Sequence, residues 1–445
     1  MVSSFSLVTT RVTFCAMDGE ATEVEVRAAP RPPQRGTMDL RIAGEALDAS
    51  PHMTATEQLS AAPGVFVDHE DGEGLGNDVY MRGFDFEHGS GIEFRVAGVP
   101  VNIPMHVLGQ GYADVGFVIP EVVRSIRVVG GIYDPEQGDA AIGGSAYYDL
   151  GVVRRGYRLS ASYGSFNQRR LVAVVAPPGE PAEDLAAVSV RQTDGFGPGN
   201  RASASASTMM QRAWEVARGY RARVSGAAYG VGASLSGVVR ADDVDAGKVG
   251  YYDTYASPFA AGQSVLSSRG QLGVELEQET EGGGAWRLGA WTAVTKLRLR
   301  ENFTGSTQAS DADPSQSGRG DLLQSTNDEA AFGMNVAWRS APVSPARWLT
   351  VGVEPGISMR SGFGDQGRSL LLPPPRLAEW DRRLDYGLET RDLAGYVDVD
   401  LRVARMLPLL ALSILPLMNG TFAEALRGAR NLRPHRSFRR IMDPA

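Results

Sequence analysis

Between residues 153 and 405, apolar residues repeatedly alternate with polar or small ones, which constrains the fold more than any other feature. The clearest stretches are 157–164, 272–277, 349–354 and 397–404. A period of two predicts β-strands with one apolar and one polar face. We count about ten to twelve such strands. Two architectures share this pattern: a barrel with a lipid-facing exterior and wet interior, and a soluble β-sandwich.

Aromatic residues and long polar segments lie near the ends of these predicted strands. The aromatics are Tyr163, Tyr220, Trp286, Trp348 and Tyr396. Segments 241–266, 301–327 and 362–390 are rich in Gly, Ser, Asp and Pro, and we predict them as loops. Transmembrane barrels have short turns at the periplasmic end and long loops at the outer end. These features favour the barrel.

The first 150 residues have a different pattern of apolar and polar residues. Thr54-Ala55-Thr56-Glu57 is a capping box, in which a Thr hydroxyl and a Glu carboxylate satisfy free amides at a helix start. The helix should end near Pro63-Gly64. Short strands and turns follow to about Asp149, which predicts a compact α+β domain.

Four short motifs occur in order over about seventy residues of this domain. They are Met81-Arg82-Gly83-Phe84, Ala97-Gly98-Val99-Pro100-Val101-Asn102, Pro120–Val129, and Gln137–Ser145. Together they resemble the plug domain of TonB-dependent outer-membrane receptors. The resemblance implies an α+β plug domain over 37–150, followed over 151–405 by an antiparallel transmembrane β-barrel. That barrel would be an incomplete, open half-barrel, because family barrels have about 22 strands.

The resemblance also marks residues of the plug. The motif positions are Arg82, Gly83, Gly98, Pro100, Glu121, Gly130, Gly143 and Gly144. A guanidinium at Arg82 could bridge to carboxylates of the barrel wall, although an ordinary surface arginine gives the same sequence. The glycines would permit tight turns or close backbone approach. The family usually has Asp where this chain has Ala97.

The N-terminal leader, 1–36, contains an alternating segment at 22–28 ahead of a Pro-rich stretch. Such a segment can be extended and pair with the sheet edge of a partner. It resembles the TonB box that the inner-membrane transducer TonB grips, here Thr22, Glu23, Val24, Glu25 and Val26. We expect it to be extended and unpaired. An exposed strand or a disordered leader is the alternative.

Several function classes are disfavoured. The formal net charge of −8 and the absence of a basic stripe argue against nucleic-acid binding. No phosphate-binding loop, zinc helix or nucleophile elbow occurs, and the five histidines have no metal-ligand spacing. We therefore expect no enzyme activity, no metal and no cofactor. Cys15 is the single cysteine.

Both ends of the chain depart from the family pattern. Met1–Met17 lacks the basic start and clean apolar core of a signal peptide. Residues 406–445 do not alternate and carry six arginines, so we expect a dispensable, poorly ordered or out-of-frame tail, with an amphipathic tail as the alternative.

The resemblance implies a receptor in the outer membrane of a Gram-negative cell, apparently truncated or frameshifted. It would take up a scarce extracellular ligand such as siderophore-bound iron, cobalamin or a sugar, with TonB as partner. A non-transporting remnant or a soluble β-rich binding protein is the alternative.

Overall fold

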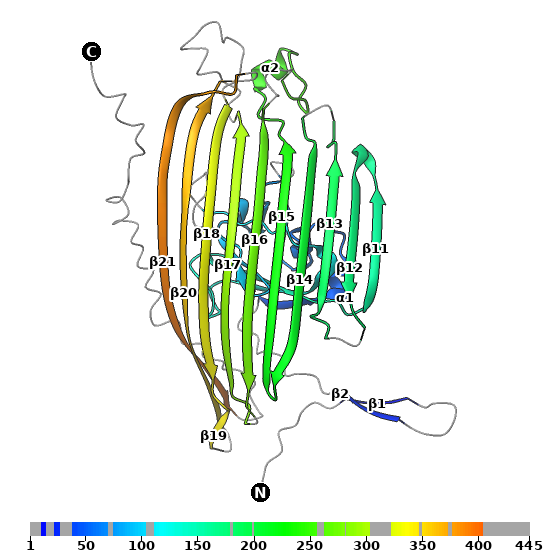
Figure 1. Ribbon diagram of the computed structural model, residues 1–445, viewed down its shortest axis with the longest axis vertical. Helices are drawn as coiled ribbons and strands as arrows, with labels where there is room; N and C mark the ends of the chain where they lie inside the picture. Colours follow the sequence, from blue (N-terminus) through cyan, green and yellow to red (C-terminus); the bar gives the residue numbers. More distant parts are fainter. Residues whose placement is uncertain are drawn as a thin grey trace, which may run out of the picture.

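The computed structural model describes most of the chain as one N-terminal α+β unit and one large sheet (Figure 1). The described residues are 10–14, 22–26, 38–69, 74–103, 111–178, 181–197, 200–255, 262–280, 282–302, 322–346, 349–372 and 376–403. None of the helices in these ranges is long and apolar enough to cross a membrane. The tail predicted at 406–445 lies outside them.

The N-terminal unit, residues 38–150, contains a five-stranded sheet in the order β3-β9-β10-β7-β8 and a three-stranded sheet β4-β5-β6. Its strands are β3 (Asp39–Ala43), β4 (Val65–Asp68), β5 (Asp78–Met81), β6 (Phe84–Phe86), β7 (Ile92–Val96), β8 (Val99–Pro100), β9 (Val123–Gly130) and β10 (Gly144–Leu150). Its helices are α1 (Gly44–Ala49) and the 3-10 helices η1 (Glu57–Ala61), η2 (Glu87–Gly89) and η3 (Pro120–Val122).

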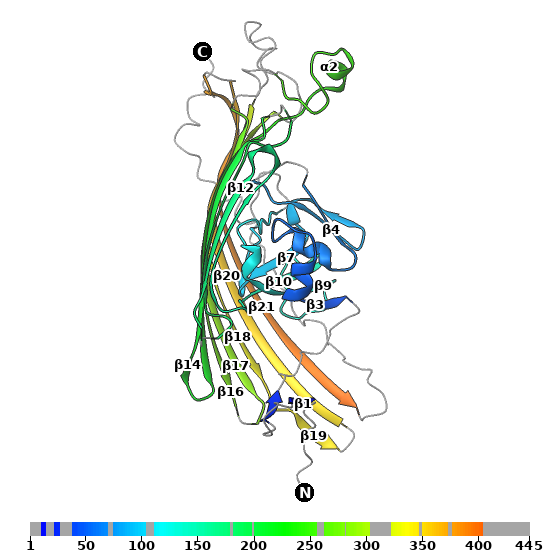
Figure 2. The ribbon, with the colours of Figure 1, turned by 90° about the vertical axis from the view of Figure 1, so that its right-hand side faces the viewer.

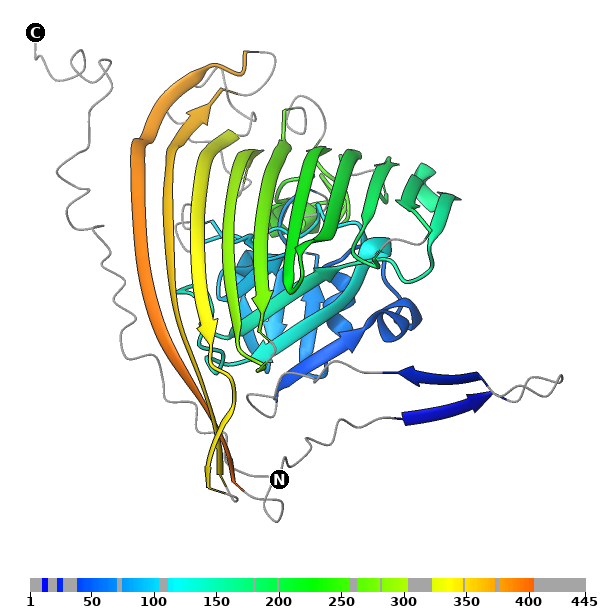
Figure 3. The same ribbon diagram turned by 60° about the horizontal axis from the view of Figure 1, so that its bottom comes forward.

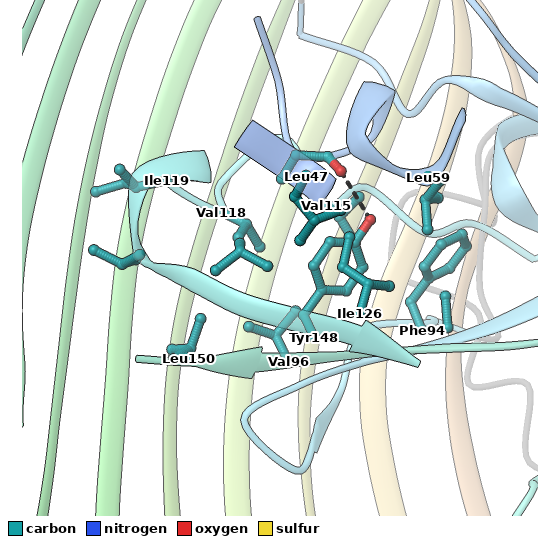
Figure 4. Close-up of a cluster of buried hydrophobic side chains, with 14 of the residues drawn as sticks. Leu47, Leu59, Phe94, Val96, Val115, Val118, Ile119, Ile126, Tyr148 and Leu150 are labelled. Carbon is teal, nitrogen blue, oxygen red and sulfur yellow. Dashed lines mark hydrogen bonds between the residues drawn. The ribbon is translucent and has the colours of Figure 1, made fainter. Parts of the chain in front are cut away.

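Large apolar side chains fill the space between the five-stranded sheet and the helices of this unit (Figure 4). Leu47 on α1, Leu59 on η1, Phe94 on β7 and Ile126 on β9 are each at most 2% exposed. Tyr148 on β10 is equally buried, and its hydroxyl donates a 3.0 Å hydrogen bond to the carbonyl of Ala55. Burial raises the pKa of the Tyr148 phenol, so this side chain remains a neutral donor.

The predicted capping box forms at the start of η1. The Glu57 amide donates to the Thr54 hydroxyl at 3.3 Å, and the Glu57 carboxylate accepts from the amides of Thr54, at 3.1 Å, and Met53. Burial alone would raise the Glu57 pKa, but the hydrogen bonds from His69 and these amides lower it to about 2. The element is a short 3-10 helix that ends before Gly64, whose φ is 77°.

The large sheet has eleven antiparallel strands, β11 to β21, that pair in chain order except that β19 lies beside β20. The strands are β11 (Gly156–Tyr163), β12 (Arg169–Ala176), β13 (Leu185–Thr193), β14 (Ser203–Ala217), β15 (Tyr220–Ser234), β16 (Ser264–Glu279), β17 (Ala285–Glu301), β18 (Leu322–Arg339), β19 (Val343–Ala346), β20 (Leu349–Leu371) and β21 (Glu379–Val403). A turn, η4 (Ser165–Asn167), joins β11 to β12, and α2 (Ala241–Asp245) lies between β15 and β16. The strand count agrees with the prediction.

The sheet is curved and open, and the N-terminal unit lies against its concave face (Figures 2 and 3). Within the described residues this is one continuous sheet, with β11 and β21 at its two edges. The predicted open half-barrel is therefore confirmed. A sandwich of two facing sheets is not what these strands form.

The two faces of the sheet reverse the burial expected of a soluble protein. On β14, the concave positions Ser207 and Gln211 are 8% and 3% exposed, whereas the convex positions Met210 and Trp214 are 52% and 41% exposed. Tyr157 on β11 is 81% exposed. The concave face is thus covered and includes buried polar side chains, and the convex face bears large exposed apolar side chains.

One loop prediction is wrong. Residues 362–390, predicted as a polar loop, are mainly the end of β20 and the start of β21, which pair from Gly362↔Thr390 to Leu371↔Glu379. Their Gly, Ser, Asp and Arg residues belong to strands whose concave side faces a polar interior. Tyr396 also differs from the expected rim aromatic, because its hydroxyl points to Glu136 of the N-terminal unit.

Candidate functional site: the interface between the N-terminal unit and the sheet

One side of the N-terminal unit is joined to the sheet by apolar packing. Val172 and Val174 on β12 and Met209 on β14 belong to the same buried cluster as Ile119 and Tyr148. The amide of Ile119 lies 3.3 Å from the sulfur of Met209. The core of the unit therefore continues into β12–β14 without a break.

An ion pair lies at the edge of this apolar contact. Arg170 on β12 grips the Glu121 carboxylate with two nitrogens, and the Nη2–Oε2 distance is 2.8 Å. Both side chains are mostly covered, at 20% and 24% exposed. Burial would raise the Glu121 pKa, but the hydrogen bonds and charge of Arg170 lower it, so the carboxylate is ionised at neutral pH.

On the other side of the unit, two sheet arginines bind three consecutive backbone carbonyls. Arg269 on β16 donates to the carbonyls of Val101 at 3.2 Å and Pro100 at 2.7 Å. Arg360 on β20 donates to the carbonyl of Asn102 at 2.7 Å. Arg269 also lies over the ring of Phe117, 5.3 Å from its centroid. Segment 100–102 is therefore bound to the concave face through its backbone carbonyls, since it contains no Asp or Glu.

A third sheet arginine contacts a carboxylate of the unit. Arg287 on β17 pairs with Glu136, which follows β9, and also with Glu354 on β20 at 3.0 Å. The Tyr396 hydroxyl lies 3.4 Å from Glu136 and 3.3 Å from Glu354. These arginine contacts with β16–β21 are polar. Beside them, Leu75, Ile103 and Tyr112 of the unit share a buried apolar cluster with Val265 on β16 and with Leu297 and Leu299 on β17.

A cavity of about 110 Å³ lies on this polar side, between the unit and β17–β21. Asp139 and Arg95 line it from the unit, and Trp291, Arg360 and Asp392 line it from the sheet. Among the described residues, no group of three His, Cys, Asp or Glu is placed to hold a metal ion.

The structure spreads the predicted motif residues over the unit. Arg82 lies in the turn between β5 and β6 with a φ of 55°, its side chain is exposed, and it forms no ion pair with another described residue. Arginines of the sheet contact the unit instead, at positions 158, 170, 269, 287 and 360. In the other direction, Arg124 of the unit pairs with Glu183, beside β12, at 3.1 Å. No sequence signal separated these residues from the other arginines of an arginine-rich chain.

Outside the β7–β8 turn, two motif glycines occupy backbone that other residues rarely adopt. Gly83 has a φ of 83° in the turn after Arg82, with open space beside it. Gly144 has a φ of 148°, and a Cβ there would lie 2.1 Å from the carbonyl oxygen of Val129. Gly130 and Gly143 border Met38 and Phe86 closely, at 2.9 Å and 2.2 Å from an added Cβ.

The β7–β8 turn makes the departure at Ala97 unfavourable. Ala97 and Gly98 have φ angles of 49° and 83°, so both are left-handed. Asp and Asn tolerate this region better than Ala. Ala97 therefore adopts a strained conformation that the usual Asp would relieve. Pro100, at the end of β8, offers its carbonyl to Arg269.

The predicted TonB-box segment is extended, as expected, but the expectation that it is unpaired is wrong. Thr22–Val26 forms β2, which pairs antiparallel with β1 (Thr10–Phe14) in the register Val12↔Val24. By pairing with β1, this five-residue strand satisfies the backbone hydrogen-bonding groups along one of its two edges. Residues 27 and 28 lie outside the described ranges.

Comparison with known families identifies the class. Residues 37–145 match the family model of the TonB-dependent receptor plug domain. Residues 37–145 are therefore a TonB-dependent receptor plug domain, and an open, barrel-like antiparallel sheet follows them. The resemblance seen in the sequence is confirmed, and the N-terminal unit is called the plug below.

Solved receptor structures share this fold at low sequence identity. The chain is similar to the ferric citrate transporter FecA in the unliganded form, with a TM-score of 0.63 and 14% identity over 82% of this chain and 54% of FecA. It is similar to the pyoverdine outer membrane receptor FpvA from Pseudomonas aeruginosa PAO1, with a TM-score of 0.59 and 12% identity over 82% of this chain and 54% of FpvA.

A third similar structure is BauA, the ferric preacinetobactin receptor from Acinetobacter baumannii. It gives a TM-score of 0.58 and 14% identity over 83% of this chain and 56% of BauA. The chain thus spans about half the length of these structures. A comparison with curated protein sequences gives no match.

Proposed function

We propose that this chain is part of an outer-membrane receptor that takes up a scarce ligand in a TonB-dependent way. The observation that carries the proposal is the reversed burial of the sheet. Met210, Leu272 and Phe332 are 43–52% exposed on the convex face, while Asn327 and Glu329 are at most 4% exposed on the concave face. Apolar side chains around a polar interior suit hydrocarbon outside and water inside.

The ends of the sheet support an orientation. The segment with α2 lies at one end of the strands, and the N-terminal strands lie at the other (Figure 2). Tyr251 and Tyr252 in the α2 segment are 73% and 65% exposed, with ring centroids 5.0 Å apart. We propose that this end faces outward and offers aromatic surface to a ligand such as siderophore-bound iron, cobalamin or a sugar.

The convex face provides the test of membrane residence. Leu272→Arg places a charge in the middle of the apolar face, where it costs about 2–4 kcal/mol in a bilayer. Val343→Arg, on the β19 hairpin, is the matched control because Val343 lies away from that face and is already 60% exposed. We expect Leu272→Arg to abolish recovery in outer membranes and Val343→Arg to preserve it. Equal recovery of both variants, or a native protein that is soluble without detergent, would support the soluble binding protein instead.

The TonB box remains part of the proposal. Strand addition to β2 requires its backbone donors, and β1 already covers one edge. Val24→Pro removes a donor from β2 and should abolish binding of a TonB C-terminal domain. Val12→Pro disrupts the same hairpin from β1 and should leave binding intact or strengthen it. Loss of binding in both variants would show that TonB recognises the hairpin rather than β2.

A further inference from the structure

An open apolar groove of about 390 Å³ lies on the convex face of the sheet, over β14–β17. Met210, Leu272 and Val294 line it and are 48–52% exposed. Gly226 and Gly270 lie between them, and a Cβ at Gly270 would meet no atom within 4 Å. Small-molecule sites in proteins typically measure about 300–1,000 Å³. The groove therefore has room for a flexible apolar chain.

Three basic side chains occupy consecutive convex positions of β17, and the first is one position beyond the groove. They are Lys296, Arg298 and Arg300, which follow Val294 at intervals of two residues. A strand rises about 6–7 Å over two residues, so neighbouring charges are close enough to contact one headgroup. We call this row of three residues the basic ladder.

The two arginines of the basic ladder have no carboxylate partner among the described residues. The residues that face them on β16 and β18 are neutral: Leu266, Ser264, Thr326 and Gln324. The Nε atom of Arg298 is buried without a hydrogen-bond partner in the described part of the chain, and Arg300 donates to Gln324 at 2.6 Å. Lys296 differs, because it lies 3.7 Å from Asp328. Two guanidinium groups are thus available to an anion, although the net charge of the chain is −8.

The basic ladder begins where the apolar band of the convex face ends. On β17 the convex positions from Trp286 to Val294 carry no charge. These positions span about 26 Å, close to the apolar band of about 25 Å in outer-membrane barrels. The neighbouring strands become charged at the same level, since Lys296 pairs with Asp328 on β18 and Asp328 pairs with Asp365 on β20. The groove therefore lies within the band, and the two arginines lie just beyond it.

We propose that the groove and the basic ladder together bind one membrane lipid that carries a phosphate group. An acyl chain lies in the groove beside Leu272, and the phosphate accepts hydrogen bonds from Arg298 and Arg300. Guanidinium groups bind phosphate oxygens through paired hydrogen bonds, and basic clusters at a membrane surface attract anionic lipids.

The basic ladder lies at the end of the sheet that carries α2. Arg300 pairs with Ser264 at the start of β16, and α2 precedes that strand (Figure 1). The lipid therefore belongs to the outer leaflet, and this placement rests on the proposed function. Binding of the lipid to the isolated protein does not depend on it.

Lipid titration of the full chain in a neutral detergent, followed by native mass spectrometry, tests the site. The probe is phosphatidylglycerol, compared with phosphatidylcholine, whose headgroup has no net charge, and with inorganic phosphate, which has no acyl chain. Combining Arg298→Gln with Arg300→Gln should raise the Kd for phosphatidylglycerol by about tenfold or more, because hydrogen bonds to charged groups are lost. Gly270→Val should raise it by about fivefold, because the new side chain occupies part of the groove.

Two substitutions on the same convex face are the matched controls. Arg391→Gln on β21 removes a guanidinium that already pairs with Glu389. Gly395→Val adds a side chain at an exposed position of β21, away from the groove. Both should leave the Kd unchanged. Lysine at positions 298 and 300 keeps both charges and should retain most of the affinity, which a variant that failed to fold would not.

Three results would overturn the lipid site. They are equal changes in the test and control variants, phosphatidylcholine binding as tightly as phosphatidylglycerol, and displacement of the lipid by inorganic phosphate with no effect of Gly270→Val. The last result would indicate a site for a free anion. If the lipid results are as expected but the chain is not recovered in outer membranes, the site stands and the proposed function fails. If the chain is recovered there but no variant changes lipid binding, the proposed function stands and the site is wrong.

Discussion

Single substitutions of Glu121 and of Arg170 should weaken the attachment of the plug to β12 by unequal free energies. Glu121→Gln removes the carboxylate and leaves Arg170 facing Arg191. Arg170→Met removes one of the two facing cations and keeps the aliphatic stem, and Glu121, at 24% exposed, can then be hydrated. We expect Glu121→Gln to be the more costly change.

The magnitudes follow from the geometry. Hydrogen bonds to charged groups contribute about 1.5–3 kcal/mol, and partial exposure of this pair places Glu121→Gln at about 2 kcal/mol. Relief of the facing charges is worth about 0.2–1 kcal/mol, which places Arg170→Met nearer 1 kcal/mol. The equilibrium constant for local separation of the plug from β12 should therefore rise about thirtyfold in the first variant and about fivefold in the second.

Protection of an Ala187→Cys variant, in a Cys15→Ser background, from thiol labelling measures this separation, because the Ala187 side chain is 2% exposed where β13 meets the plug. The Glu121 pKa is lowered in the folded state, so the contribution of the pair is present at neutral pH and is lost as pH falls through that pKa. Labelling of the native pair should increase on acidification, and Glu121→Gln should lack this dependence. A loss in Arg170→Met that equals or exceeds the loss in Glu121→Gln would refute the reasoning.

Three further outcomes are expected for the plug. Glu57→Gln should lower the free energy of unfolding by about 1 kcal/mol. The folded pKa of Glu57 is about 2 against an ordinary 4.5, so the native protein loses stability as pH falls between those values. Urea unfolding at several pH values should show that the Glu57→Gln variant lacks this loss. Gly144→Ala should prevent the plug from folding because the added Cβ would lie 2.1 Å from a carbonyl oxygen. Gly83→Ala has open space around the new Cβ and should lower the free energy of unfolding by only about 1–2 kcal/mol. Similar losses for both variants by calorimetry would contradict this. Tyr148→Phe should cost about 1–3 kcal/mol by leaving the buried Ala55 carbonyl without its donor, and an unchanged melting temperature would count against that bond.

Local patterns predicted much of the fold because each depends on nearby backbone. The alternation at 272–277 lies in β16, that of 397–404 lies in β21 as far as Val403, and the capping box at Thr54–Glu57 forms as written. The segment 362–390 misled the prediction for a physical reason. A strand with one side toward a polar interior carries the same residue types as a loop, and only its pairing with a neighbouring strand distinguishes it from a loop.

The contacts between plug and sheet could not be predicted in the same way. Only two of the 44 basic residues are lysines, so a single arginine carries little information. Arg360 meets the carbonyl of Asn102 across 258 residues of sequence. Which arginines face inward depends on strand register, which a one-residue shift reverses. Glu121 was marked by its motif, but its partner became visible only when β12 was placed against the plug.

The bare convex face determines what the tryptophans of this chain can report. Trp214, Trp286, Trp338 and Trp380 are 38–49% exposed there, and Trp286 and Trp338 stand opposite each other with ring centroids 6.1 Å apart. Their emission will follow the surrounding medium, remaining red-shifted in water and turning blue in lipid or detergent whether or not the plug is attached. Trp291, beside Arg360 on the concave face, is placed differently. In a variant that keeps Trp291 as its single tryptophan, the emission wavelength would report whether the plug is docked, and no longer whether the convex face is in lipid or detergent.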